Sequence, residues 1–163
     1  MKTYIGVKMI AAIAMTLGEY NNYQGWDIPK DQDPNREGYL VEYLGQGNAN
    51  HPKHENYISW SPKEVHESSY FEIATDNRIT EEDVNGFLVK GAGIKMGEKT
   101  TVLMDTTLTG FDMLGSSPCV DPANYNQEIG DTYARKAIID KLWGHLGFVL
   151  QWAKFGLTRK SSQ

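Results

Sequence analysis

The sequence predicts an α+β fold built from small antiparallel sheets, of which the C-terminal one is a meander covered by one long amphipathic helix. Residues 121–146 have the apolar spacing of a helix. Extended segments joined by glycine-containing turns precede that helix, and short strands alternate with helix starts over residues 1–70. We expect four parts along the chain: a small α+β module at 1–70, a connector at 71–79, an α-β-β-β-α domain at 80–155 and a flexible tail at 156–163.

The first unit is expected to begin with a strand at residues 3–14, because aromatic and β-branched residues recur there. Thr16 and Glu19 have the spacing of a capping box, so a short helix begins after Thr16. Gly25 is placed to end that helix.

Two more strands are expected at residues 39–43 and 57–60, on either side of a loop rich in turn residues. Ser61 then offers a helix cap, Pro62 suits the first helical position and Glu64 closes a capping box. A short helix therefore closes the first unit.

The second unit is expected to begin with a capping box at Thr80 and Asp83 and to continue as a meander. Its three extended segments are residues 87–96, 101–107 and 111–116. Side chains of the middle segment alternate between two faces, as expected when a helix covers one of them. The two faces consist of Thr101, Leu103 and Asp105, and of Val102, Met104 and Thr106.

The long helix carries the strongest structural signal in the chain. Asp121 is a good N-cap and Pro122 fits the first helical position. Gly130 inside the helix costs about 1 kcal/mol relative to alanine, which predicts close approach to a flat surface such as a sheet. Asp131 and Arg135 are expected to pair across one helical turn. One broad apolar stripe of this helix is expected to consist of Tyr125, Ile129, Tyr133 and Ala137, with Ala134, Ile138 and Leu142 beside them.

The end of the long helix is expected near residues 143–145, where Gly144 and Gly147 cluster. Residues 148–155 form either a returning strand or a last helical turn, and the pattern leaves both open.

The composition excludes several classes of function. The chain has 163 residues and a net charge of −5. A non-specific nucleic-acid surface needs a basic face, so DNA and RNA are disfavoured as partners. Cys119 is the only cysteine, so the chain forms no internal disulfide and no four-cysteine zinc site.

The N-terminus imitates a signal peptide, with an early lysine, an apolar run and an Ala-x-Ala sequence. Lys8 splits that run and the same residues suit a strand, so we expect no cleaved leader. No apolar run approaches the roughly 20 residues that a membrane span needs. We expect a reducing, intracellular setting.

A calcium loop and a metal site both have simpler interpretations. Asp31, Asp33 and Glu42 occupy ligand positions of a calcium loop, but Arg36 stands where that loop needs glycine, which favours a solvated acidic loop. His51 and His54 have the spacing of two metal ligands, yet no third ligand lies at a suitable distance in the sequence. We interpret them as surface histidines and expect no metal.

Cys119 precedes the long helix, where a thiol becomes more reactive. A nucleophile also needs an oriented base, and none is adjacent. We interpret Cys119 as a small buried residue and expect no catalytic set.

Aromatic residues gather near the strand ends and loops of the first unit, and core packing explains most of them. The functional alternative is a stacking surface for a base, worth about 1–3 kcal/mol per base. In that alternative Lys63, at a helix start beside Trp60, and Arg135 meet a phosphate. The candidate ligand-binding residues are Trp26, Tyr43, Trp60, Lys63 and Arg135.

An ordered run of motifs stands between residue 80 and about residue 150. Its members are Gly110-Phe111, Ser117-Pro118-Cys119-Val120-Asp121-Pro122, Asn124-Tyr125, Glu128-Ile129-Gly130, Ala134-Arg135, Ala137, Lys141-Leu142-Trp143 and Gly147. In these motifs the chain resembles the phage gene-49/gene-66 family of small tailed-phage and prophage proteins. Gly144 departs from that family, which usually has proline there.

Residues 3–70 contain a second set of motifs: Tyr4-Ile5-Gly6, Met15-Thr16, Gly25-Trp26, Gly38-Tyr39-Leu40-Val41-Glu42-Tyr43 and Ser59-Trp60-Ser61-Pro62-Lys63-Glu64-Val65. They resemble an N-terminal module common in phage accessory proteins, which also occurs ahead of domains similar to anti-defence proteins that sequester signalling nucleotides.

The two resemblances imply a phage-encoded accessory protein made in the host bacterial cytoplasm, and they supply no catalytic residues. We expect the protein to be non-catalytic and to use no cofactor, because the sequence shows no catalytic constellation. The implied role is counter-defence by sequestering a small signalling nucleotide, cyclic or of the ADP-ribose type. We expect a homo-oligomer, because a subunit interface encloses a small ligand better than one small domain does. The alternative is a protein-binding adaptor or inhibitor of a host or phage protein. An enzyme acting on nucleotides is disfavoured.

Overall fold

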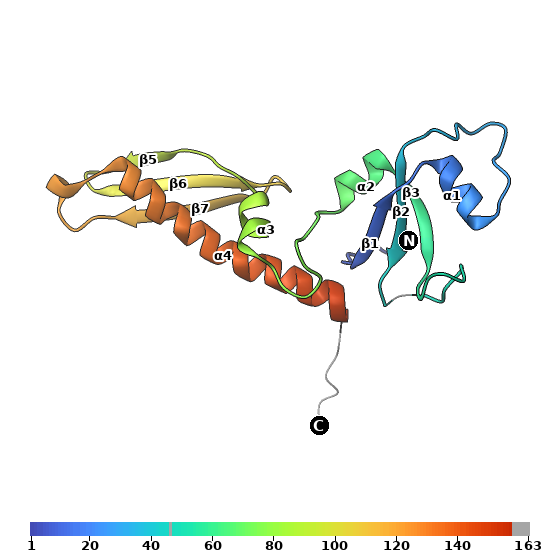
Figure 1. Ribbon diagram of the computed structural model, residues 1–163. Helices are drawn as coiled ribbons and strands as arrows, with labels where there is room; N and C mark the ends of the chain where they lie inside the picture. Colours follow the sequence, from blue (N-terminus) through green and yellow to red (C-terminus); the bar gives the residue numbers. More distant parts are fainter. Residues whose placement is uncertain (46, 158–163) are drawn as a thin grey trace, which may run out of the picture. The chain divides into compact units, whose positions relative to one another are not determined.

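The computed structural model describes residues 1–45 and 47–157 and confirms the α+β class, with two small antiparallel sheets and one long helix (Figure 1). The chain divides into two compact units. Unit 1 comprises Met1–Glu72 together with the residues from Gln151 onward, and unit 2 comprises Ile73–Leu150. The tail predicted at residues 156–163 lies outside the described residues from residue 158 on.

Unit 1 is a three-stranded antiparallel sheet in the order β1-β2-β3, with one helix on each face (Figure 1). Successive side chains of the central strand β2 point to opposite faces. Leu40 therefore packs with Tyr20 of α1, while Tyr39 stacks on His66 of α2 with ring centroids 4.0 Å apart. The elements are β1 (Ile10–Ala14), α1 (Leu17–Gln24), β2 (Gly38–Tyr43), β3 (Ile58–Pro62) and α2 (Lys63–Ser69).

Helix α1 confirms the start and stop signals in the sequence. The Thr16 hydroxyl accepts from the backbone N–H of Glu19, and the Glu19 carboxylate accepts from the backbone N–H of Thr16. Gly25 ends the helix with φ 72°, a left-handed conformation that glycine adopts without strain. The next loop returns to the helix, where the Gly18 N–H donates to the Pro34 carbonyl at 2.8 Å.

Two boundaries in unit 1 differ from the prediction. Strand β1 begins at Ile10 rather than at residue 3, because its ladder with β2 ends at the pair of Ile10 and Tyr43, next to the bond from the Leu44 N–H to the Met9 carbonyl. Helix α2 has Pro62 at its N-cap and no side-chain cap bond. Ser61 does not cap it because Ser61 still pairs with Tyr39 in the sheet.

Unit 2 is an antiparallel sheet around the central strand β6, with helix α4 along one face (Figure 1). Strand β7 pairs with one side of β6, and β4 and β5 share the other side. The single segment predicted at residues 87–96 forms two strands, because the Gly91 N–H between them donates to the Asp105 carboxylate instead. The elements are α3 (Glu81–Gly86), β4 (Leu88–Val89), β5 (Gly93–Met96), β6 (Thr100–Thr107), β7 (Asp112–Pro118) and most of α4 (Gln127–Phe155).

The capping box of α3 and the alternation of β6 are confirmed. Thr80 accepts from the Asp83 N–H, and the Asp83 carboxylate accepts from the Thr80 N–H. Thr101, Leu103 and Asp105 are each 0% exposed on the face that α4 covers.

The broad apolar stripe predicted for the long helix is confirmed on one side only, where Ala134, Ile138 and Leu142 are buried. Ile129 is 58% exposed and Tyr133 is 60% exposed. The neighbouring row faces the sheet instead, because its small residues let the helix backbone come close to β6 and β7. This buried row consists of Gly130, Ala134, Ile138, Leu142 and Leu146.

The predicted role of Gly130 is confirmed. A Cβ added at this position would overlap the Thr101 hydroxyl of β6, and one added at Gly115 of β7 would overlap the Ala134 carbonyl of α4. Two glycines, one on the helix and one on the sheet, therefore set the distance between the two layers.

Helix α4 begins and ends later than predicted. Asp121 caps a short 3-10 turn, Pro122–Asn124, by accepting from the Ala123 N–H at 2.9 Å. The helix then runs from Gln127 to Phe155, so residues 148–155 are helical. Gly156, with φ 63°, follows its last residue. No helix within the described ranges is long and apolar enough to cross a membrane.

Candidate functional site

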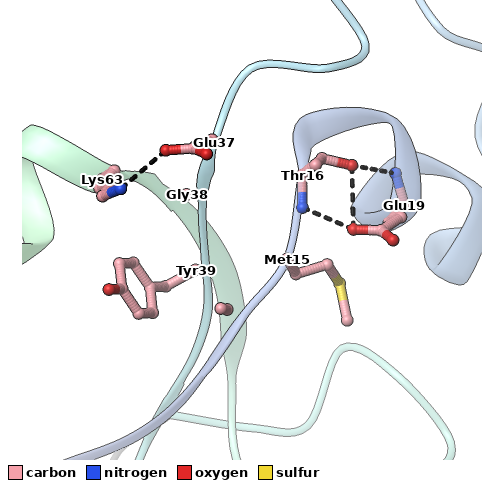
Figure 2. Close-up of a pocket in the computed structure, with 8 residues that line it drawn as sticks. Met15, Thr16, Glu19, Glu37, Gly38, Tyr39 and Lys63 are labelled. Carbon is pink, nitrogen blue, oxygen red and sulfur yellow. Dashed lines mark hydrogen bonds and ion pairs between the residues drawn. The ribbon is translucent and has the colours of Figure 1, made fainter.

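A recess of about 250 Å³ lies in unit 1 where the end of β1 meets the start of β2, and we call it the Lys63 recess (Figure 2). Figure 2 shows the Glu37–Lys63 ion pair on one side of it and the Thr16–Glu19 capping box on the other. Its lining residues are Ala14, Met15, Thr16, Glu19, Glu37, Gly38, Tyr39 and Lys63.

The charges of the Lys63 recess are already paired. Lys63 Nζ lies 2.8 Å from Glu37 Oε2, and this hydrogen bond raises the pKa of Lys63 and lowers the pKa of Glu37. The hydrogen bond from the Thr16 N–H lowers the pKa of Glu19. Two carboxylates therefore flank one ammonium group, and an anionic ligand gains no net attraction from them.

A second recess of about 310 Å³ has a different character, and we call it the Tyr43 recess. The rings of Tyr43 and Tyr57 lie 6.2 Å apart, and Lys8 Nζ lies 5.1 Å from the Tyr43 ring centroid. Ser59 donates a hydrogen bond to the Tyr43 hydroxyl at 3.2 Å. Of the described residues, no carboxylate lines this recess and none forms an ion pair with Lys8. It therefore combines two aromatic rings with one positive charge.

The residues predicted to bind a ligand do not converge on one site. Tyr43 and Lys63 line different recesses. Trp60 packs against the core of unit 1, where its indole N–H donates to a backbone carbonyl at 2.8 Å. Trp26 is 56% exposed and lines neither recess. Arg135 belongs to unit 2.

Arg135 neutralises a buried carboxylate. Its Nε donates to Asp105 at 3.0 Å and its Nη2 donates to the Gly91 carbonyl at 2.9 Å. Asp105 is 0% exposed. The predicted pair with Asp131 is wrong, because Asp131 accepts a hydrogen bond from Gln127 and Arg135 reaches the sheet. The guanidinium group therefore joins α4 to β6 and to the segment between β4 and β5.

A cluster that the sequence analysis missed joins a helix, a strand and a loop of unit 1. His54 Nδ1 lies 2.7 Å from Glu42, and His54 Nε2 lies 3.0 Å from the Tyr23 hydroxyl. The hydrogen bonds from His54 and then from Asn56 lower the pKa of Glu42. His51 stacks on Tyr23 with ring centroids 4.3 Å apart. The prediction of surface histidines is wrong, because these contacts leave both rings partly buried.

Glu42 is the residue from which this cluster could have been predicted, because a carboxylate inside a strand with apolar neighbours needs a polar partner when it is partly buried. The cluster lines neither of the two recesses. Among the described residues, no group of three or more His, Cys, Asp or Glu side chains is placed to hold a metal ion. We interpret the cluster as structural, because its hydrogen bonds hold the loop before β3 against α1 and β2.

The acidic loop and the cysteine have local hydrogen bonds. Residues 29–37 are exposed and the Asp33 carboxylate accepts from the Asn35 N–H at 2.9 Å, so the prediction of a solvated loop is confirmed. Cys119 is half-buried rather than buried, and its thiol donates to the Asp121 carbonyl at 3.2 Å. It lies at the exit from β7, before the 3-10 turn rather than against the core.

The face of the unit 2 sheet opposite α4 carries large exposed apolar side chains with polar residues among them, and we call it the open sheet face. The strand register places Met104 beside Leu114 and Ile94 beside Val102, so these side chains form a continuous surface. Exposed apolar residues that gather on one face mark an interaction site more often than scattered ones do. The large exposed residues of the open sheet face are Val89, Ile94, Met96, Met104 and Leu114, which are 47–64% exposed.

The comparisons with known proteins bear on α2 and unit 2. Residues 62–153 match the family described as Phage protein (N4 Gp49/phage Sf6 gene 66) family. No curated protein and no solved structure matches the chain. The resemblance of residues 3–70 to a phage accessory module therefore stays a prediction. The match spans more than half of the sequence, and the chain belongs to the N4 Gp49/phage Sf6 gene 66 family of phage proteins.

Proposed function

We propose that this phage accessory protein is non-catalytic and binds another protein through the open sheet face of unit 2. The observation that carries the proposal is the set of large apolar side chains exposed on neighbouring strands of one face. The face lies within the range that matches the family.

Burial of this face is favourable but modest. A fully buried Leu or Met side chain gains about 1.5–3 kcal/mol, and side chains that are already half-buried gain roughly half of that. The five residues together then supply about 5 kcal/mol, which is similar to the cost of association alone. The partner must therefore also bond to the polar residues among them, and we expect a reversible contact. These polar residues are Thr100, Thr106, Asp112 and Ser116.

The test compares two charge substitutions at equally exposed positions. Leu114→Glu lies on the open sheet face, and Ile129→Glu lies on the solvent side of α4, with each wild-type side chain 58% exposed. Tagged variants are used to capture partners from infected cells, and the affinity for a partner retained in stoichiometric amount is then measured with purified proteins. Leu114→Glu should abolish the interaction and Ile129→Glu should retain it. Equal affinity in both variants would exclude this face.

A second candidate function is sequestration of a small signalling nucleotide, and the Tyr43 recess favours it. Its volume of about 310 Å³ is at the lower end of the roughly 300–1,000 Å³ typical of ligand pockets. Tyr43 and Tyr57 offer rings for a base and Lys8 offers a charge for a phosphate. This moves the candidate site away from Trp60 and Lys63.

Thermal stability measured with cyclic oligonucleotides and ADP-ribose derivatives tests the second candidate. A ligand at one hundred times its dissociation constant adds about 2.7 kcal/mol to the stability. The shift should disappear in Lys8→Ala and remain in Lys63→Ala, the matched control. Recovery of intact nucleotide supports sequestration, and recovery of altered nucleotide indicates an enzyme. The absence of any shift across the panel leaves protein binding as the function.

A further inference from the structure

Within the described part of the chain, the outer edge of β1 in unit 1 lacks the usual protection of an edge strand. Strand β1 pairs with β2 on one side and is the end strand of the sheet order (Figure 1). Its sequence, Ile-Ala-Ala-Ile-Ala, contains no charge and no proline, and its residues from Ala11 to Ala14 are exposed. Natural proteins block such edges with charges, prolines, bulges or covering segments, because an open edge pairs with other strands.

The ladder to β2 determines which backbone groups of β1 remain available. Residues opposite each other in an antiparallel pair alternate between bonded and non-bonded pairs. The Leu44 N–H donates to the Met9 carbonyl, and the Met15 N–H donates to the Gly38 carbonyl, so the odd-numbered residues bond to β2. The outward N–H and C=O groups therefore belong to Ile10, Ala12 and Ala14.

The segment before β1 has a strand-forming sequence but belongs to no strand among the described residues. Tyr4 is 85% exposed and Ile5 is 83% exposed. Residues 4–8 also equal β1 in length, with Met9 between the two segments. The chain therefore carries a free edge and, beside it, a strand-forming segment of matching length.

We propose that two copies of this chain pair through β1, with a two-fold axis at Met9, so that residues 4–8 of each copy add to the β1 edge of the other. The two three-stranded sheets then join into one continuous sheet. A second copy is the favoured partner because one symmetric pairing satisfies both the free edge and the unpaired segment twice.

The outward groups select the register of this pairing. Bonded pairs must join even-numbered residues of both copies. An axis at Met9 places Ile5 opposite Ile13 of the second copy, so two side chains that are 83% and 61% exposed cover each other. An axis at Lys8 would place two lysines opposite each other, which is destabilising, and an axis at Ile10 or beyond leaves fewer paired residues. The bonded pairs are Tyr4 with Ala14, Gly6 with Ala12 and Lys8 with Ile10.

Disulfide crosslinking tests the register. In a Cys119→Ser background, Met9→Cys places two thiols on the axis in a non-bonded pair, with Cα atoms about 4.5 Å apart, within the disulfide range. Ile13→Cys is the matched control, because the two copies of residue 13 would lie roughly 27 Å apart in this register. We expect a disulfide-linked dimer from Met9→Cys alone. Crosslinking of Ile13→Cys in place of Met9→Cys would overturn the register.

Sedimentation of the full chain tests the interface itself. Ala12→Pro removes one outward N–H without removing a bond to β2, and Ala12→Ser keeps that N–H as the control. Ile5→Asp is a second variant, at a position too exposed to affect folding. We expect a wild-type dimer whose dissociation constant rises at least about tenfold in Ala12→Pro and Ile5→Asp. A monomeric wild type, or a dimer that both variants leave unchanged, would overturn the proposal. Neither result bears on the open sheet face, which belongs to unit 2.

Discussion

Gly130→Ala is expected to destabilise unit 2, although alanine is favoured over glycine in a helix by about 1 kcal/mol. The added Cβ would overlap the Thr101 hydroxyl and lie 2.7 Å from Thr101 Cβ. Thr101 is 0% exposed and its hydroxyl bonds to the Tyr125 hydroxyl at 3.1 Å, so the side chain has no space to move away. Helix α4 must therefore shift away from β6.

The expected magnitude follows from three contributions. Overpacking of a core costs about 1–3 kcal/mol, and loss of the hydrogen bond between Thr101 and Tyr125 adds about 1 kcal/mol. The helix preference of alanine offsets about 1 kcal/mol. The net expected loss is about 1–3 kcal/mol. Gly144→Ala is the control, because no atom lies within 4 Å of a Cβ added there, and it should stabilise by up to about 1 kcal/mol.

Native-state hydrogen exchange of peptides from β6, read by mass spectrometry, measures this effect in unit 2 separately from unit 1. The free energy of opening should fall for Gly130→Ala and rise for Gly144→Ala. Thr101→Ala removes part of the overlap, so the double variant Gly130→Ala/Thr101→Ala should lose less than the sum of the single losses. A gain in stability for Gly130→Ala would refute the close helix–sheet contact.

The remaining predictions concern the buried charges. Arg135→Met leaves the Asp105 carboxylate without a counter-charge. It should lower the free energy of unfolding by about 3–5 kcal/mol, measured by urea unfolding followed by circular dichroism. If the losses of Arg135→Met and Asp105→Asn were strictly additive in the double variant, the two residues would not be coupled. Burial pushes the pKa of Asp83 upward, but three hydrogen bonds lower it overall, so its stabilisation is present above its ordinary pKa of 3.8 and is lost as the pH falls through its folded pKa. The free energy of unfolding in urea should therefore be lower for Asp83→Asn than for the wild type at pH 7, and the difference should be much smaller at pH 3. The pKa of Glu42 is also lowered, chiefly by the hydrogen bond from His54, so the charged carboxylate helps to hold the loop before β3. Glu42→Gln should therefore increase hydrogen exchange in that loop at pH 7 and leave exchange in unit 2 unchanged. Unchanged exchange in the loop would contradict this structural role.

Local signals predicted the starts of α1 and α3 better than they predicted the buried face of α4. The capping boxes at Thr16 and Thr80 both form, because their hydrogen bonds join residues three positions apart. The buried face of α4 was not predictable in the same way, because two adjacent rows of the helix are apolar. The row that contains Gly130 faces the sheet because it fits against Thr101, which the helical period cannot show.

The roles of the candidate site residues depend even more than the buried face of α4 on contacts between residues that are distant in the sequence. Lys63 is a plausible phosphate ligand by residue type, but Glu37 neutralises it from the start of another strand. Glu42 and His54 meet because the loop after β2 turns back, and the sequence spacing does not show that turn. Lys8, by contrast, was not considered as a ligand and lies beside Tyr43 in the recess without a carboxylate.

The sequence by itself determined the α+β class, the capping boxes at Thr16 and Thr80, and the position in the long helix, Gly130, that comes close to another layer, because each signal lies in residues near one another in the chain. Only the tertiary structure decided that Arg135 pairs with Asp105, thirty residues away, and that the face of the unit 2 sheet opposite α4 stays exposed. The physical reason is that a charge or an apolar side chain takes its role from the groups packed against it, and loops bring those groups from distant parts of the chain.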